Sequence, residues 1–343
     1  GSSHRRPLFS LPEPPPFPPG SRRRRGMIDC PNGDPKTWQV GACRVSRVME
    51  METVGGQTWI MPGASKELTK SVEWLVPDFA DERGRMKFAI QLMVVDAPGG
   101  IRVAVDTCVG NDKKRPLDHW NMRTAPFLEH LRAAGFPPES VTHVFCTHLH
   151  TDHIGWNTRW EGGRWVPTFP QARYLFGRAE YEYWSQGGRA GEGGSEGGIE
   201  EELADSIAPV LEAGLVDLVD LHHVLLDTGD TRLYLRPTLG HTPGHVSLMI
   251  ESRGAKAIIT GDCFHHPLQF TEVDCGSRAD VDPAEATRTR ETLLHEFCGT
   301  PTLVFGTHFA RPTCGTVRRH RRKNFLLDTA AAVAFEAAAP AKL

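Results

Sequence analysis

The chain has 343 residues, and its 39 Lys and Arg stand against 42 Asp and Glu, which gives a net charge of −3 at pH 7. With 39% hydrophobic and 24% charged residues, the composition is that of a globular protein and excludes a disordered or fibrous chain. Since no run of about 18 apolar residues is present, we expect neither a membrane-spanning helix nor a membrane partner.

The charge is unevenly distributed along the chain. Residues 1–26 hold six Arg and one Glu, together with seven of the 26 prolines, and residues 27–343 therefore carry a net charge of −8. A domain of that sign does not suit a nucleic-acid partner. We expect residues 1–26 to be a disordered tail that begins with a cloning scar, Gly-Ser-Ser-His, with an SH3-type ligand as the alternative. Residues 27–343 are expected to form a single domain.

Short apolar runs rich in Val and Ile and ended by Gly or Asp predict β-strands along the whole of this domain. In chain order they are 38–45, 88–95, 101–106, 142–147, 172–176, 223–226, 233–235, 246–250, 257–260 and 303–305. Helical spacing predicts helices at 125–134, 179–185, 201–213, 283–297 and 324–338. Asp282 followed by Pro283 is typical of a helix start, and seven glycines within 187–198 indicate a flexible loop. This mixture predicts an α/β fold in which two mainly antiparallel sheets pack together with helices outside.

The eight cysteines are scattered through the chain, and no two of them form a Cys-x-x-Cys pair. Such a distribution is typical of reduced thiols rather than of a disulfide framework. We therefore expect a cytoplasmic protein.

A dense group of ligand-type side chains, His-Leu-His-Thr-Asp-His at 148–153, directly follows the predicted strand 142–147. Imidazole nitrogens and carboxylate oxygens bind Zn²⁺-like ions at about 2.0–2.2 Å. The alternation of His148 and His150 places both rings on one side of an extended segment, and Asp152 and His153 follow the turn. Four ligands so close together cannot all serve one tetrahedral ion without strain, so the segment predicts two neighbouring metal ions.

Four further side chains of the same types stand at the ends of predicted strands. His241 and His245 belong to a tight Gly/Pro turn in the string LGHTPGHVSL, Asp262 follows the strand 257–260, and His308 follows the strand 303–305. Loops at the strand ends of a rigid scaffold commonly carry functional residues. We therefore expect these side chains to complete the two metal sites.

Taken in order, Asp106, the 148–153 motif, His241, Asp262 and His308 resemble the metallo-β-lactamase superfamily, over roughly residues 38–310. The TPGHxSL-type turn, the Gly-Asp pair before a loop that ends in Gln269-Phe270, and the last Gly-x-His are similar to the branch with N-acyl-homoserine lactonases and methyl parathion hydrolase. The resemblance implies an αββα sandwich, with two mixed, mainly antiparallel sheets inside and helices on the outer faces.

The resemblance also implies two divalent ions, with zinc as the expected metal and manganese or iron as alternatives. The seven ligands fall into a first-metal group, a second-metal group and a bridging carboxylate, which are His148, His150 and His241; Asp152, His153 and His308; and Asp262. Asp106 would orient a ligand from outside the ligand set. His245 would do the same or, as the preferred interpretation, be a packed or hydrogen-bonded structural histidine.

Two residues are candidates for a part in catalysis beyond metal binding. The resemblance implies that Asp152 hands a proton to the leaving group. Lactonases of this branch carry Tyr three positions after the bridging carboxylate, where this chain has His265, which would either hydrogen-bond a developing oxyanion or line the loop. Cys263 directly follows Asp262, but neighbouring side chains point apart, so we expect Cys263 to pack as a small buried hydrophobe.

The reaction that the resemblance implies is hydrolysis, in which a hydroxide held between the two metal ions attacks the substrate. A neutral lactone or carboxylic ester suits an acidic domain, and organophosphate triesters or β-lactams would be side substrates. Aromatic residues that flank the motif loops predict an apolar wall of the pocket, with ordinary core packing as the alternative, and they are Trp156, Trp184, Phe264 and Phe270. The sequence leaves a homo-oligomer open.

Three other functions are alternatives. RNA-processing nucleases of the superfamily share the Thr-His-x-His-x-Asp-His string, but the basic cluster 318–323 is more simply the start of a solvated helix. Di-iron proteins of the superfamily carry Glu where His150 stands, and they are accompanied by a flavin-binding domain that this sequence does not predict. The last alternative is a metal-binding module without catalysis, although every ligand position is filled.

Overall fold

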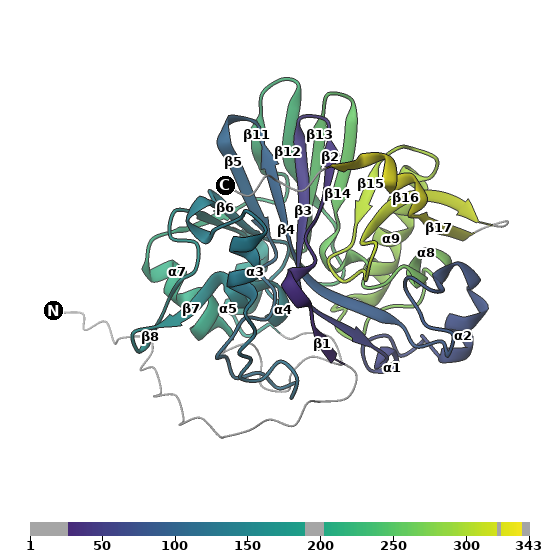
Figure 1. The fold of residues 1–343 in the computed structure, drawn as a ribbon, viewed down its shortest axis with the longest axis horizontal. Helices are drawn as coiled ribbons and strands as arrows, with labels where there is room; N and C mark the ends of the chain where they lie inside the picture. Colours follow the sequence, from purple (N-terminus) through teal and green to yellow (C-terminus); the bar gives the residue numbers. More distant parts are fainter. Residues whose placement is uncertain (1–26, 189–201, 321–323, 338–343) are drawn as a thin grey trace.

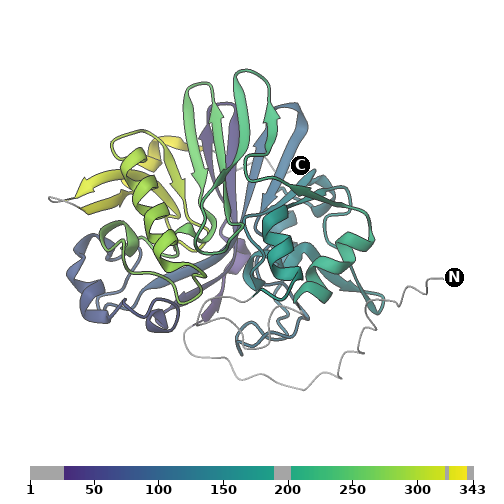
Figure 2. The same cartoon turned by 180° about the vertical axis from the view of Figure 1, so that it is seen from behind.

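The computed structural model describes residues 27–188, 202–320 and 324–337. Two β-sheets pack face to face, and helices cover their outer faces (Figure 1; Figure 2). This four-layered arrangement confirms the predicted αββα fold class.

The first sheet is built mainly from the N-terminal half of the chain. In spatial order its strands are β10 (Val216–Val219), β9 (Arg173–Gly177), β6 (His143–Cys146), β5 (Ile101–Val105), β4 (Lys87–Ala97), β3 (Cys43–Val54), β2 (Lys36–Val40) and β18 (Glu336–Ala337), and β1 (Met27–Asp29) also pairs with β3. Neighbours from β10 to β5 pair parallel, whereas neighbours from β5 to β18 pair antiparallel. The sheet is therefore mixed, as predicted.

The second sheet comes from the C-terminal half of the chain. Its strands, in spatial order, are β11 (Val224–Asp227), β12 (Thr231–Pro237), β13 (Val246–Ser252), β14 (Ala255–Ile259), β15 (Leu303–Phe305), β16 (Cys314–His320) and β17 (Asn324–Asp328). Only β14 and β15 pair parallel in this sheet, and the other neighbours pair antiparallel. A separate hairpin joins β7 (Thr158–Glu161) to β8 (Arg164–Pro167).

The α-helices gather in two groups (Figure 1). Those beside the first sheet are α3 (Phe127–Ala133), α4 (Thr151–Ile154), α5 (Arg178–Ser185) and α7 (Ala208–Glu212), which continues a π-helical turn at Leu203–Ile207. Those beside the second sheet are α1 (Gln57–Ile60), α2 (Lys66–Ser71), α8 (Leu268–Thr271) and α9 (Pro283–Phe297). Short 3₁₀ turns lie at Pro31–Gly33, Glu73–Leu75, Pro98–Gly100, Pro138–Ser140, Gly155–Asn157, Gly261–Cys263 and Ala330–Phe335.

The core between the two sheets is made of buried apolar side chains from both. Trp38 of β2 meets Phe305 of β15 edge to face, with their ring centroids 5.2 Å apart. Because helices cover the outer faces as well, strands are buried on both sides, and β13 begins with five consecutive buried residues. This double burial explains why the strands were visible in the sequence as continuous apolar runs.

Helix α9 begins and ends where the sequence predicts. The side chain of Asp282 accepts a hydrogen bond from the backbone N–H of Glu285, and Pro283 occupies the first turn, where no N–H is needed. Leu293, Leu294 and Phe297 form its buried face against the second sheet.

The C-terminal part of the chain departs from the prediction. Over the described residues 324–337, the expected helix 324–338 is instead β17, a 3₁₀ turn and β18. In β17, Phe325 and Leu327 are buried alternately with their neighbours, which suits a strand. Of the basic cluster 318–323, the described residues 318–320 are not a helix start but the end of β16, where Arg319 stacks on the Phe325 ring at 4.6 Å.

The expected strand 38–45 is a hairpin of β2 and β3. Its turn contains Gly41, whose φ of +60° lies in the left-handed region that favours glycine. A side chain at Gly41 would also overlap the carbonyl of Ser252. The predicted tail 1–26 and most of the predicted glycine-rich loop 187–198 lie outside the described residues. Within the described ranges, no helix is long and apolar enough to cross a bilayer.

Four strand ends converge on one region of the molecule. Asp106 directly follows β5, and the 148–153 segment follows β6 in the first sheet. Asp262 and His308 follow β14 and β15 in the second sheet. Since β5 pairs parallel with β6 and β14 with β15, each pair delivers its side chains at the same edge of its sheet.

Candidate metal centre

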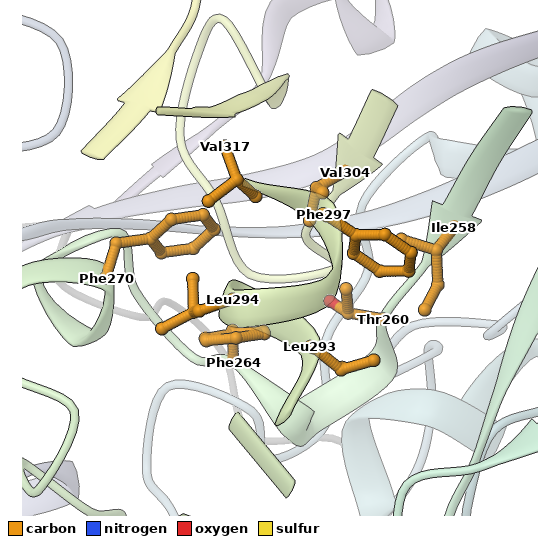
Figure 3. A pocket seen from close by; sticks show the side chains of 9 residues that line it. All are labelled: Ile258, Thr260, Phe264, Phe270, Leu293, Leu294, Phe297, Val304 and Val317. Atoms are coloured by element: carbon orange, nitrogen blue, oxygen red, sulfur yellow. The ribbon is translucent and has the colours of Figure 1, made fainter. Parts of the chain in front are cut away.

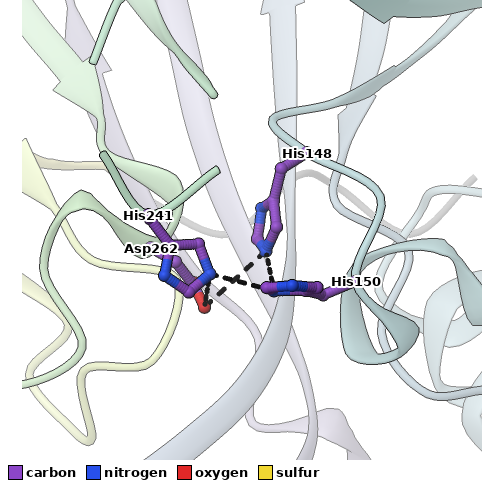
Figure 4. Close-up of side chains that lie close together, drawn as sticks. All are labelled: His148, His150, His241 and Asp262. Carbon is purple, nitrogen blue, oxygen red and sulfur yellow. Dashed lines mark hydrogen bonds and ion pairs between the residues drawn. The ribbon is translucent and has the colours of Figure 1, made fainter. Parts of the chain in front are cut away.

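Three histidine nitrogens meet in the first group of side chains, which Figure 4 shows together with Asp262. Nδ1 of His150 lies 3.0 Å from Nε2 of His148 and 2.9 Å from Nε2 of His241. His148 and His150 follow β6, and His241 belongs to the turn between β12 and β13. The structure therefore brings together the three residues predicted for the first metal ion.

Hydrogen bonds on the far side of the rings fix which nitrogen carries the proton. Nδ1 of His241 lies 2.9 Å from Oδ1 of Asp280, which can only accept, so His241 donates there and keeps the lone pair on Nε2. His148 donates through Nδ1 to the hydroxyl of Thr147, whose own hydrogen goes to Asp106. Both rings thus turn a lone pair toward the centre of the group.

The protonated forms of His148 and His150 are disfavoured. Burial lowers the pKa of both rings well below the ordinary value, and neighbouring imidazoles lower it further. His148 and His241 each turn a lone pair toward Nδ1 of His150, and three neutral imidazole nitrogens so close together form a donor set that Zn²⁺ prefers. The donor chemistry of this group therefore fits a divalent cation.

The second group consists of Asp152, His153 and His308. The Nε2 atoms of the two rings are 3.2 Å apart, and the carboxylate of Asp152 lies 3.4 Å from His308 and 3.7 Å from His153. Nδ1 of His153 lies 3.0 Å from Oδ2 of Asp106, and His308 donates through Nδ1 to the carbonyl of Ala89 at 3.0 Å. Both rings again face the centre of the group through Nε2.

Carboxylates around the second group favour positive charge there. Burial alone would lower the pKa of His308, but the carboxylates of Asp262 and Asp152 raise it to about 9. The pKa of His153 is raised in the same way, against burial, by Asp262, Asp106 and Asp152. A cation between these rings would satisfy the same carboxylates that otherwise hold protons there.

Asp262 joins the two groups. Its Oδ2 lies 3.4 Å from His241 Nε2 and 3.8 Å from His148 Nε2, whereas its Oδ1 lies 3.2 Å from His153 Nε2 and 3.0 Å from His308 Nε2. Each oxygen thus faces one group, which is the geometry of a bridging carboxylate.

The two residues expected to orient ligands both contact a ligand or its backbone. His245 accepts the backbone N–H of Asp262 at Nε2, at 3.0 Å, and contacts the hydroxyl of Thr238 through Nδ1, at 2.8 Å. Asp106 accepts the backbone N–H of Thr147 at 2.8 Å and also contacts His153. Both nitrogens of His245 are therefore engaged away from the metal groups.

His265 lies beside the bridging carboxylate: it is 3% exposed, and its Nε2 is 3.1 Å from Oδ2 of Asp262. Burial lowers the pKa of His265, which favours the neutral ring. Its Nδ1 is buried without a hydrogen-bond partner among the described residues. The ring thus contacts the proposed bridging carboxylate, and a part of His265 in oxyanion stabilisation stays a prediction. Cys263 is buried, as expected, and burial raises the pKa of its thiol to about 12.

The predicted aromatic wall of the pocket is mostly core. Phe264 and Phe270 pack beneath α9 with their ring centroids 4.9 Å apart. They line a small apolar gap, shown in Figure 3, in which Thr260 supplies the only polar side chain among the lining residues. Trp156 stacks on Phe127 and donates its indole N–H to Glu50. These three aromatic side chains were assigned to the pocket because they are near the motifs in sequence, but the apolar layers beside each sheet bury them.

Trp184 is the member of that set that contacts a predicted ligand. It is 2% exposed, and its ring meets the His150 ring edge to face with centroids 5.3 Å apart. The sequence reasoning missed two buried carboxylates that also contact the site, Asp280 and Glu180. Neither belongs to a motif, and each reaches its partner only through the fold.

Comparison with known proteins agrees with this geometry. The family model described as the metallo-beta-lactamase superfamily matches residues 92–308. The chain is 26% identical over 182 residues to the N-acyl homoserine lactonase AttM of Rhizobium radiobacter, which covers 48% of this chain and 57% of the relative. It is 27% identical over 183 residues to the N-acyl homoserine lactonase of a Bacillus species, which covers 51% and 59%. The chain therefore spans less than two thirds of the length of these relatives.

Solved structures are similar over a larger part of the chain. AidC, described as a dizinc quorum-quenching lactonase, superposes with a TM-score of 0.66 at 21% identity, over 85% of this chain and 96% of AidC. The hydrolase AbOPH superposes with a TM-score of 0.67 at 19% identity, over 86% and 96%. At these identities the similarity concerns the fold. Since the family model covers more than half of the sequence, the chain belongs to the metallo-β-lactamase superfamily.

Proposed function

We propose that the chain is a metal-dependent hydrolase of lactones or carboxylic esters, with N-acyl homoserine lactones as the first substrates to test. The observation that carries this proposal is the position of Asp262, whose two oxygens face two separate groups of imidazole nitrogens. The names of the curated relatives, both N-acyl homoserine lactonases, support the substrate class.

The proposed cofactor is a pair of divalent ions, with zinc favoured by the nitrogen and carboxylate donors and manganese or iron as alternatives. When bound, such a pair activates water near neutral pH and polarises the substrate carbonyl. His148, His150 and His241 would hold the first ion. Asp152, His153 and His308 would hold the second, and Asp262 would bind both.

The side chains around the metal ligands would orient the ligand atoms, and one of the ligands would transfer a proton. Asp106 contacts Nδ1 of His153, so that Nε2 of this ring faces the second group, and His245 accepts the backbone N–H of Asp262. In this proposal Asp152 carries the proton to the leaving oxygen through its carboxylate, which is 12% exposed against 5% for Asp262 and is thus more open to substrate. His265 holds Asp262 through Nε2.

A hydrolysis assay on metal-loaded protein tests the proposal. The substrates are N-acyl homoserine lactones of several chain lengths, aryl esters, phosphotriesters, β-lactams and single-stranded RNA. We expect turnover of lactones or esters that a chelator abolishes and zinc restores. Hydrolysis of RNA alone would favour the nuclease alternative, and no turnover of any substrate by protein with two bound metal ions would favour the binding module.

A matched pair of substitutions links the assay to the site. Asp262→Asn keeps the shape of the bridging side chain but removes its charge, and we expect it to lower kcat by at least about 100-fold. Asp220→Asn is the control, because its side chain is 88% exposed and pairs only with Arg178 among the described residues. Equal activity of the two variants would contradict the assignment of Asp262.

A further inference from the structure

A buried carboxylate outside the predicted ligand set lies directly behind the first histidine group. Glu180 of α5 is 1% exposed. Its Oε1 accepts the backbone N–H of Leu149 at 3.0 Å and the indole N–H of Trp184 at 2.6 Å, and its Oε2 accepts the backbone N–H of Gly244 at 3.1 Å. One carboxylate thus satisfies three buried donors from three segments of the chain.

Two of these donors belong to the segments that carry the first-metal ligands. Leu149 stands between His148 and His150, and Gly244 stands in the turn that begins at His241. Glu180 therefore joins the motif after β6 to the turn between β12 and β13. These segments come from different sheets, and the convergence of their nitrogens depends on how the segments are held together.

The third donor reaches a ligand through its ring. Trp184 receives its orientation from Glu180 and meets the His150 ring edge to face at 5.3 Å. Gly244 packs so closely on α5 that a side chain there would overlap the backbone nitrogen of Glu180. The contact between helix and turn is therefore short and specific.

We propose that Glu180 is a positioning residue of the first metal site, which sets the relative placement of His148, His150 and His241 before the ion binds. The inference rests on the proposed metal centre and adds a residue that does not itself ligate. Hydrogen bonds to a carboxylate are roughly twice as strong as neutral ones. A donor set fixed in advance does not have to be ordered when the metal binds, and this raises the affinity.

The test is the substitution Glu180→Gln. An amide has one acceptor oxygen, so Gln can serve either Leu149 and Trp184 or Gly244, and its NH₂ group then faces the remaining N–H. One segment loses its anchor while the size of the side chain is unchanged. We expect the affinity of one of the two zinc ions to fall by about 10–100-fold, as is typical when a group that supports a ligand is altered.

Glu50→Gln is the matched control. Glu50 is also buried, and its carboxylate accepts the backbone N–H groups of Val109 and Gly110 and the indole N–H of Trp156. The chemical change is the same and three N–H groups again meet one carboxylate, but these donors lie outside the segments that carry the first-metal histidines. Unlike Glu180, Glu50 also faces the guanidinium of Arg123 at 4.0 Å. We expect Glu50→Gln to lower the melting temperature at least as much as Glu180→Gln does, and to change the zinc affinities less.

The readout is the pair of zinc dissociation constants of the apo-protein, measured by competition with a chromophoric chelator, together with the melting temperature. If Glu180→Gln does not fold, Glu180→Asp replaces it, because a carboxylate one methylene shorter cannot reach both Leu149 and Gly244. Unchanged constants in the Glu180 variant, or equal losses in the Glu180 and Glu50 variants, would overturn the inference but leave the proposed function intact. A wild-type chain that binds no zinc would overturn both.

Discussion

Oδ1 of Asp280 lies 2.9 Å from Nδ1 of His241, and both side chains are buried. The other oxygen of Asp280 accepts the backbone N–H of Ser277 at 3.0 Å and faces the guanidinium of Arg290 at 3.5 Å. Asp280 thereby keeps the proton of His241 on the nitrogen that points away from the metal groups. A carboxylate behind a histidine ligand also raises the basicity of the ring.

Asp280→Asn is therefore expected to weaken zinc binding. The amide cannot accept from both His241 and Ser277, so either the ring loses its partner or a backbone N–H is left unpaired. The expected loss in zinc affinity is about 10–100-fold, measured by chelator competition. Asp282→Asn, two residues further along, should change the affinity little, because Asn caps the start of α9 as well as Asp does. Equal affinities in wild type and Asp280→Asn would contradict this role.

The close approach of the His241 turn to α5 predicts a stability effect. Gly244→Ala would place a methyl group against the backbone of Glu180, and one of the two segments would have to move. We expect the free energy of unfolding to fall by about 1–3 kcal/mol in urea denaturation. Gly63→Ala is the control, since its new methyl would meet only Cys275 at an ordinary 3.4 Å, and its effect should stay within about 1 kcal/mol. The prediction fails if both variants are equally stable.

Lys113 makes stability depend on pH in the alkaline range. Burial lowers its pKa from 10.5 to about 7, despite the nearby Asp205. Between these two values the unfolded chain binds a proton that the folded chain does not. The free energy of unfolding therefore rises with pH across this window, by at most about 1.4 kcal/mol per pH unit. The destabilisation caused by burying the charged ammonium of Lys113 is complete below pH 7 and absent above pH 10.5.

Lys113→Met removes this titration and tests it. The nonpolar side chain can still pack on the Trp165 ring, over which the ammonium lies at 3.5 Å, and Asp205 keeps its pair with Arg115. In urea denaturation at pH 7, 8 and 9, the stability advantage of the variant over wild type should shrink as pH rises. An advantage that is constant or grows would show that Lys113 does not titrate in this way.

Thiol labelling tests the burial of the cysteines. All eight lie in the described ranges, and seven are buried while Cys298 is partly exposed. Burial raises the pKa of Cys30, Cys43 and Cys275 to about 11, so their thiols stay protonated at neutral pH. Native protein should react at Cys298 alone, and Cys298→Ser should abolish labelling until the chain is unfolded. Any fast-reacting thiol in the folded Cys298→Ser variant would contradict the packing.

Much of the metal centre could be predicted because its ligands occur in local patterns. His148 and His150 alternate at a strand end, and Asp262 and His308 each follow an apolar run, so sequence spacing alone placed them in strand-end loops. The agreement of α9 with its predicted bounds has the same origin, since Asp282 and Pro283 are local signals. Whether these residues bind metal stays a prediction until it is measured.

What the sequence could not reveal depends on long-range packing. Asp280 and Glu180 meet the site through contacts across 39 and 64 residues, and nothing near them in the chain marks such partners. Phe264 and Phe270 were placed in the pocket because they are near Asp262 in sequence, but they point into the layer beneath α9. In the C-terminal part, alternate burial of Phe325 and Leu327 places residues 324–328 in a strand, and the alanine-rich stretch after it forms a 3₁₀ turn instead of the α-helix that its propensity favours.

The number of divalent ions bound per chain tests the central claim most directly. Elemental analysis of wild-type protein, loaded with zinc and freed of excess by gel filtration, should give two ions per chain, because Asp262 serves both groups. The Asp262→Asn variant, treated in the same way, should retain fewer. One ion or none in wild type, or two ions held equally tightly in Asp262→Asn, would contradict the account.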